Sequence, residues 1–220
     1  MSNYRIKKTS AFELRGLSLL KSMGFGIEAN NTDSNAIDYR ILKDKNNRDT
    51  GYLYVDFQYS SDFIKYGDIR IDIISAYEKG NQTNYNILAN IKSDLNEVDK
   101  LSIEDFKEAL QGNLKVQKFG KLFDKDLNSI IFFVFNQEDK DVNVEDIPDI
   151  IAIIPRLTIE NFIVKYHKSI FNKIKLNDKS KVGDKHGSAF IAITFASLYA
   201  FEPFFIIYPK ELKETLLVTK

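Results

Sequence analysis

Polar and apolar residues alternate along two stretches of the chain, residues 52–59 and residues 68–76. This period of two is typical of strands that bury one face. In the first stretch the apolar face carries Leu53, Val55 and Phe57, and the polar face carries Tyr54, Asp56 and Gln58. In the second stretch the apolar face carries Ile69, Ile71 and Ile73. We therefore predict a half-buried strand at each place.

Helices are predicted where apolar residues recur at helical spacing. The expected helices cover residues 10–23, 103–114, 158–174 and 188–201. Gly24 is suited to end the first helix, because glycine readily adopts the left-handed conformation found after many helices. Ser102 is suited to cap the second, since its hydroxyl can accept a hydrogen bond from a backbone N–H of the first turn.

Further strands are expected at shorter apolar segments, two of which are continuous apolar runs suited to buried strands. These segments are residues 26–30, 36–42, 130–135, 150–154 and 204–208. The mixture of helices and strands predicts an α/β fold with a mixed central sheet flanked by helices. A length of 220 residues suits a single domain over residues 1–220.

No segment of the sequence predicts a membrane span. The most apolar stretch, residues 188–208, carries Glu202 as its only charge, but Pro203 interrupts it before the roughly 20 apolar residues that a spanning helix needs. The first 16 residues hold five charged side chains and no continuous apolar core. We therefore expect a cytoplasmic protein without a membrane partner.

The composition excludes several kinds of chemistry. The chain has no cysteine and two histidines, so thiolate catalysis and cysteine-ligated metals are excluded and a histidine-based site is disfavoured. Lysine and arginine balance aspartate and glutamate at 31 each, but the charge is uneven. Residues 161–186 carry seven lysines against two aspartates, and residues 1–23 carry five basic side chains against Glu13. Both stretches suit either a phosphate backbone or a solvated surface.

Two aspartates are candidates for a metal site. If residues 36–42 and 52–59 form a hairpin centred on Asn47, Asp38 lies directly opposite Asp56. Like charges opposed across a strand pair destabilise a sheet unless a cation lies between them. Oxygen ligands without histidine or cysteine suit a hard ion, Mg²⁺ or Mn²⁺.

Other candidate residues come from three further segments. Asp68, Arg70 and Asp72 share the polar face of their strand, where they form either a neutralised solvated surface or an extension of the acidic site. His186 precedes the predicted C-terminal helix and could contact a phosphate at that helix terminus. Glu13 projects into the apolar arc of the first helix, where a carboxylate needs a partner.

Residues 10–60 resemble the core of the PD-(D/E)XK nucleases, which include restriction endonucleases and Holliday-junction resolvases. The residues that carry the resemblance are Glu13, Leu19-Leu20, Gly24-Phe25-Gly26-Ile27, Ile37-Asp38 and Tyr54-Val55-Asp56-Phe57-Gln58. That family has an acidic N-terminal helix, a strand after a Gly-aromatic pair, a strand with an aspartate and an adjacent strand with (Asp/Glu)-x-Lys. The resemblance implies a restriction-endonuclease-like core over residues 1–135, with residues 136–220 as a C-terminal α/β elaboration that includes added helices.

The resemblance also implies roles for individual residues. Asp38 and Asp56 match the two acids that would hold Mg²⁺ or Mn²⁺, and Glu13 matches the helix acid that would complete the outer sphere. Gln58 stands where the family usually has lysine, and it could orient a water molecule but not donate positive charge. Lys65 or Arg70 would then supply the missing charge.

A second alignment uses Asp56 as the lone acid and Asp68-Ile69-Arg70 as a degenerate tripeptide. Under either alignment the expected function is metal-dependent hydrolysis of DNA by an endonuclease, which could act as a homodimer. One alternative is a non-catalytic module of related α/β fold that binds nucleic acid or a protein, and another is a structural or assembly protein whose aspartates lie on a solvated sheet face. Gln58 and the neutral net charge favour the non-catalytic module.

Overall fold

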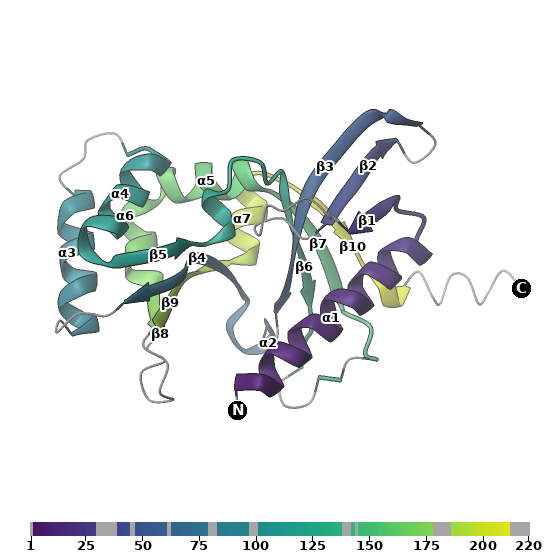
Figure 1. Ribbon diagram of the computed structural model, residues 1–220, viewed down its shortest axis with the longest axis horizontal. Coiled ribbons are helices and arrows are strands. Elements are labelled where there is room, and N and C mark those ends of the chain that lie inside the picture. The colour runs from purple at the N-terminus through teal and green to yellow at the C-terminus, as the bar shows by residue number, and fades with distance from the viewer. Residues whose placement is uncertain are drawn as a thin grey trace, which may run out of the picture. The chain divides into compact units, whose positions relative to one another are not determined.

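The computed structural model describes residues 2–29, 39–44, 47–60, 63–78, 83–96, 101–137, 142–143, 145–177 and 186–211. The chain divides into two compact units. Unit 1 comprises Met1–Ile69, Lys125–Arg156 and Glu202–Lys220, and unit 2 comprises Arg70–Asp124 and Leu157–Phe201. Each unit therefore combines segments that are distant in the sequence (Figure 1).

Unit 1 is built on a six-stranded sheet with the strand order β1-β2-β3-β6-β7-β10. Its strands are β1 (Ile27–Ala29), β2 (Tyr39–Asp44), β3 (Asn47–Ser60), β6 (Ser129–Val134), β7 (Ile150–Pro155) and β10 (Phe205–Ile207). β3 and β6 run parallel and the other neighbours run antiparallel. This mixed sheet, with helix α1 (Ser2–Ser22) across it, confirms the predicted α/β class (Figure 1).

α1 buries its apolar arc against one face of this sheet. Phe12 and Leu20 are buried with Val55 and Phe57 in one apolar cluster, and the ring of Phe12 stacks on that of Tyr59 with centroids 4.4 Å apart. Each fully buried side chain of this size contributes about 1.5–3 kcal/mol. The face of β3 that carries Val55, Phe57 and Tyr59 is therefore the core face.

Gly24 ends α1 as predicted. Its φ of 89° is left-handed, its N–H donates to the Lys21 carbonyl, and the Phe25 N–H donates to the Leu20 carbonyl. These two bonds satisfy carbonyls at the end of the helix and form a Schellman motif. The turn leads directly into β1, which begins at Ile27.

Unit 2 contains a four-stranded sheet with the strand order β5-β4-β9-β8. Its strands are β4 (Asp68–Glu78), β5 (Lys115–Phe119), β8 (Ile174–Asn177) and β9 (His186–Thr194). Its helices are α3 (Asn84–Asn96), α4 (Ile103–Asn113), α5 (Arg156–Lys165), α6 (His167–Ile170) and α7 (Phe195–Phe201), with 3-10 turns η1 (Lys121–Phe123) and η2 (Phe171–Lys173). The short helix α2 (Phe63–Tyr66) precedes β4.

The prediction of a helix over residues 188–201 is wrong in its first half. These residues begin in β9, which continues to Thr194, and only then does α7 follow. Ala189, Ile191 and Ile193 are buried while the residues between them are half-buried, so the segment has the period of a strand. The predicted helix over residues 158–174 is likewise broken, into α5, α6 and η2. No described helix is long and apolar enough to cross a membrane.

Candidate functional site

The first three strands of unit 1 carry polar side chains on the face opposite α1. In β2 and β3, Tyr39 pairs with Val55, Arg40 with Tyr54, Ile41 with Leu53 and Leu42 with Tyr52. These four pairs follow the register predicted from the sequence, and the register shifts only near the turn, where Asp44 pairs with Asn47. The predicted partner of Asp56, Asp38, lies outside the described residues.

We call this surface the polar hairpin face. Its described members are Glu28, Arg40, Tyr52, Tyr54, Asp56 and Gln58. Glu28 pairs with Arg40, and Arg40 with Tyr54, so the three share one face. Because side chains alternate along a strand, the other members of β3 follow Tyr54 onto the same face.

Asp56 is the most buried acid of the polar hairpin face. Its residue is 4% exposed. β3 lies between β2 and β6, and Asp56 pairs with Ile130 of β6. Gln58, two residues further along, is half-buried and pairs with Phe132. The sheet therefore presents a carboxylate and an amide side by side on one face.

Arg40, Glu28 and Tyr52 form a second polar cluster on the same face. Arg40 Nη2 donates to Glu28 Oε2 at 3.2 Å, and the Arg40 guanidinium lies 4.2 Å from the centre of the Tyr52 ring. The Nε of Arg40 is buried and has no hydrogen-bond partner among the described residues. The guanidinium therefore lies toward the turn of the hairpin, because Tyr52 precedes Tyr54 on β3 and Asp56 follows it.

Glu13 comes from the other side of the sheet. It is half-buried on α1, which packs against the core face of β3 through the Phe12–Tyr59 stack. Asp56 and Gln58 project from the opposite face of that strand. Glu13 is therefore carried on the side of the six-stranded sheet opposite to the face from which Asp56 and Gln58 project.

The basic candidates lie on other elements. Lys65 is exposed on α2, with its Nζ 5.0 Å from the Tyr66 ring centre. Arg70 is exposed on β4, and its guanidinium lies 5.5 Å from the ring centre of Phe190 on β9. Neither residue is on a strand that neighbours β3, because the neighbours of β3 are β2 and β6.

Asp68 and Asp72 flank Arg70 on β4, as the alternation predicted. Asp68 is half-buried and Asp72 is exposed, while Ile69 and Ile71 are fully buried. β4 belongs to the four-stranded sheet. The second alignment therefore lacks the adjacent strand it requires, because Asp68 and Arg70 are not on a strand beside β3.

His186 is the first residue of β9, so the prediction that it precedes a helix terminus is wrong. Its side chain lies outside the described residues. Among the described residues no group of three histidine, aspartate or glutamate side chains is arranged to hold a metal ion. Asp38, the second predicted ligand, is outside that set.

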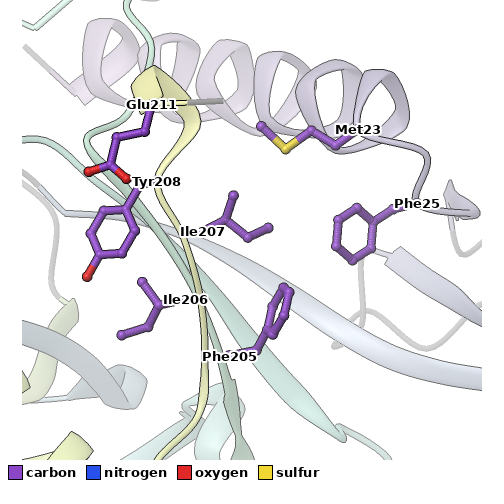
Figure 2. A pocket seen from close by; sticks show the side chains of 7 residues that line it. All are labelled: Met23, Phe25, Phe205, Ile206, Ile207, Tyr208 and Glu211. Carbon is purple, nitrogen blue, oxygen red and sulfur yellow. The ribbon is translucent and has the colours of Figure 1, made fainter. Parts of the chain in front are cut away.

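Unit 1 also has an apolar groove of about 450 Å³. Figure 2 shows Phe205, Ile206 and Ile207 of β10 along it, with Met23 and Phe25 from the turn that follows α1. Its one charged lining residue among those described is Glu211. Apolar walls and a carboxylate do not suit a phosphate group, so this groove is not part of a candidate nucleic-acid site.

The comparisons with known proteins give no relative from which a role could be transferred. No family model, curated protein or solved structure matches the chain. The assignment of the candidate site therefore rests on the chemistry of its own residues. Sequence reasoning singled out Asp56 and Gln58 but missed the Arg40–Glu28 pair, which the pairing of β1 with β2 brings together.

Proposed function

We propose that this protein is a metal-dependent endonuclease that hydrolyses phosphodiester bonds in DNA, with a core like that of the PD-(D/E)XK nucleases. The observation that carries the proposal is the burial of Asp56 on the polar hairpin face, beside Gln58. A carboxylate that is 4% exposed is retained at a cost in free energy. We interpret the retention of an acidic residue at this buried position as a functional requirement for negative charge there.

The arrangement of elements supports the same proposal. A helix that carries Glu13 is followed by a strand after Gly24-Phe25, then by the antiparallel pair β2 and β3. Asp56 is on β3, next to β2. This order agrees with the layout that the resemblance implies for residues 10–60.

In the proposed centre, the carboxylates of Asp38 and Asp56 and the backbone carbonyl of Phe57 would hold Mg²⁺ or Mn²⁺. This set of oxygen donors fits a hard divalent cation. The bound ion would supply an acidified water molecule and charge stabilisation at the phosphate. Gln58, through its amide, would orient that water molecule by hydrogen bonding.

The test is cleavage of plasmid, linear and branched DNA with Mg²⁺ or Mn²⁺, by the wild type and by Asp56→Asn. Asp56→Asn should lower cleavage by about 100-fold or more, because it removes the negative charge of a metal ligand. Asp146→Asn, which changes another acid of unit 1 away from the polar hairpin face, should cut as the wild type does. Circular dichroism and thermal melts establish that both variants are folded.

Metal binding provides an independent measurement. Titration calorimetry with Mn²⁺ should give heat for the wild type and much less for Asp56→Asn and Asp38→Asn. A wild type that neither cuts any of these substrates nor binds Mn²⁺ would contradict the proposal. Cleavage that survives in Asp56→Asn would move the centre away from β3.

A second candidate function is binding of nucleic acid without cleavage. The specific observation in its favour is Gln58, a neutral amide where a nuclease of this kind usually has a cation. DNA binding by the wild type without cleavage or Mn²⁺ binding would establish this alternative.

A further inference from the structure

Unit 2 contains a polar groove that the sequence did not predict. It lies between α3 on one side and η2 with β8 on the other, and its volume is about 720 Å³. We call it the α3–β8 groove. The lining residues used in the argument are Asn84, Tyr85, Lys92, Asn96, Asn172 and Lys175.

The charge of the α3–β8 groove is positive. Lys92 and Lys175 line it, and no acid does among the described residues. Lys168 and Lys173, both exposed, lie on α6 and η2, in the segment that leads into β8. In a chain whose net charge is zero, this concentration of lysines favours a polyanionic ligand.

The walls of the groove are joined by a hydrogen bond. Lys92 Nζ on α3 donates to Asn172 Oδ1 on η2 at 2.9 Å, and the two residues are 80 positions apart in the sequence. This bond holds the lysine at the groove without neutralising it, because an amide oxygen carries no net charge. A phosphate can therefore still use the charge of Lys92.

Tyr85 gives the groove an aromatic surface. It is 81% exposed, more than any other exposed large hydrophobic residue of the described chain. A planar ring with a face open to solvent can stack on a nucleic-acid base, and such stacking tolerates any base. Beside it, Asn84 Oδ1 is buried without a hydrogen-bond partner among the described residues.

Amide side chains complete the lining. Asn84, Asn96 and Asn172 each carry a carbonyl acceptor and an NH₂ donor, the groups that hydrogen-bond the edges of unpaired bases. The groove therefore has groups for each part of a single-stranded nucleic acid. Its lysines can contact phosphates, its exposed tyrosine can stack on a base, and its amides can hydrogen-bond the base edges. A duplex keeps its bases stacked inside and would leave Tyr85 without a partner.

We propose that the α3–β8 groove binds single-stranded nucleic acid. The lysines contact the phosphates and Tyr85 stacks on a base. This inference goes beyond the proposed cleavage and does not depend on the metal centre, because every residue that carries it belongs to unit 2.

Fluorescence anisotropy with a labelled oligothymidylate of about 20 nucleotides, at several salt concentrations, tests the proposal. Lys92→Glu and Lys175→Glu should each weaken binding about tenfold or more. Lys92→Gln and Lys175→Gln, which each remove one positive charge, should each reduce the slope of log affinity against log salt concentration by about 0.7. Tyr85→Ala should weaken binding about tenfold without changing that slope, and Tyr85→Phe should bind as the wild type does.

The matched control is Lys118→Glu. Lys118 is exposed on β5, at the edge of the four-stranded sheet opposite β8. It should leave affinity nearly unchanged. Equal losses in Lys118→Glu and Lys92→Glu would overturn the proposal, because the binding would then follow net charge alone.

Other polyanions show whether the groove prefers a single-stranded nucleic acid. An oligouridylate of the same length shows whether RNA binds as DNA does, and either result with the same variant pattern supports the groove. Heparin and poly-glutamate should bind more weakly, and the binding of duplex DNA, heparin and poly-glutamate should not respond to Tyr85→Ala. Equal affinity for all of them, or no binding of the single strand by the wild type, would overturn the proposal.

The two proposals fail separately. The groove variants Lys92→Glu and Tyr85→Ala should bind Mn²⁺ as the wild type does, since Asp56 belongs to unit 1 and the groove to unit 2. Loss of cleavage with retained binding therefore bears only on the metal centre. Loss of binding in the groove variants with retained Mn²⁺ binding bears only on the groove.

Discussion

Arg40 and Glu28 form an ion pair across β2 and β1, with Nη2 of the arginine 3.2 Å from Oε2 of the glutamate. Each side chain is 30% exposed, so solvent screens the pair only in part. We expect a double-mutant cycle with Arg40→Met and Glu28→Gln to give a coupling energy of about 0.5–1 kcal/mol. Urea denaturation of the four proteins measures it.

The chain offers an internal comparison for that pair. Arg15 and Glu145 approach to 3.9 Å, but their side chains are 42% and 85% exposed. The same cycle on this pair should give a coupling energy near zero, because both groups remain hydrated. A coupling energy as large as that of Arg40 and Glu28 would show that burial does not distinguish the two pairs.

Gly16 lies directly beneath the ring of Phe133. A Cβ built at this glycine would overlap the ring, with Cε2 only 2.6 Å away. Gly16→Ala should therefore destabilise unit 1 by about 1–3 kcal/mol, because the core must shift to admit a methyl group. The variant Gly16→Ala/Phe133→Leu should recover part of this loss. Thermal and urea denaturation provide the measurements.

Gly112 is the matched control for Gly16→Ala. It also lies in a helix, α4, but a Cβ there meets nothing within 4 Å. Gly112→Ala should stabilise the protein by up to about 1 kcal/mol, because alanine has the higher helix propensity. Destabilisation by both variants to the same extent would rule out the steric explanation for Gly16.

The capping box of α4 predicts a pH dependence. Asp105 Oδ2 accepts hydrogen bonds from the Ser102 hydroxyl at 2.6 Å and from the Ser102 N–H at 2.7 Å, and these bonds lower the pKa of Asp105. The pKa of an aspartate in an unfolded chain is about 3.9. The stabilisation is therefore fully present above that pH and is lost as the pH falls through the lower pKa of the folded state.

Urea midpoints measured between about pH 6 and pH 2 test this dependence. The wild type should lose stability over the acid part of the range, and Asp105→Asn should lose less over the same interval. Ser93→Ala, at an exposed serine of α3, should follow the wild type. An identical acid profile for the wild type and Asp105→Asn would show that Asp105 makes no contribution.

Local patterns predicted more of the fold than of the candidate site. The register of β2 with β3 could be predicted because a hairpin centred on Asn47 sets the pairing, and a slip by one residue would turn Val55 away from the core face. The parallel pairing of β3 with β6 joins residues more than 70 positions apart, and no local pattern specifies it. Arg40 and Glu28 meet only because β1 and β2 pair.

Helix α3 was not predicted from the sequence, and for that reason the α3–β8 groove was not predicted either. Residues 84–96 are rich in asparagine and the helix buries only Ile87, Ile91 and Leu95, so its apolar stripe is narrow. The lysines of residues 161–186 were visible in the sequence, but Lys92 and Tyr85 face them only after folding. Half of that groove thus depends on contacts that the local sequence does not encode.

Gln58→Lys tests the proposed centre from the opposite direction. Gln58 is half-buried beside Asp56 on the polar hairpin face, and lysine there would place a cation next to the scissile phosphate. We expect the variant to cut DNA about tenfold faster than the wild type with Mg²⁺, equivalent to about 1.4 kcal/mol at the transition state. The control Gln111→Lys adds the same charge on the exposed surface of α4 and should cut at the wild-type rate. Equal acceleration by both lysines would mean that attraction of DNA, and not chemistry beside Asp56, limits the reaction. No acceleration by Gln58→Lys would show that a cation at position 58 does not assist cleavage, which would contradict a centre of this kind on β3.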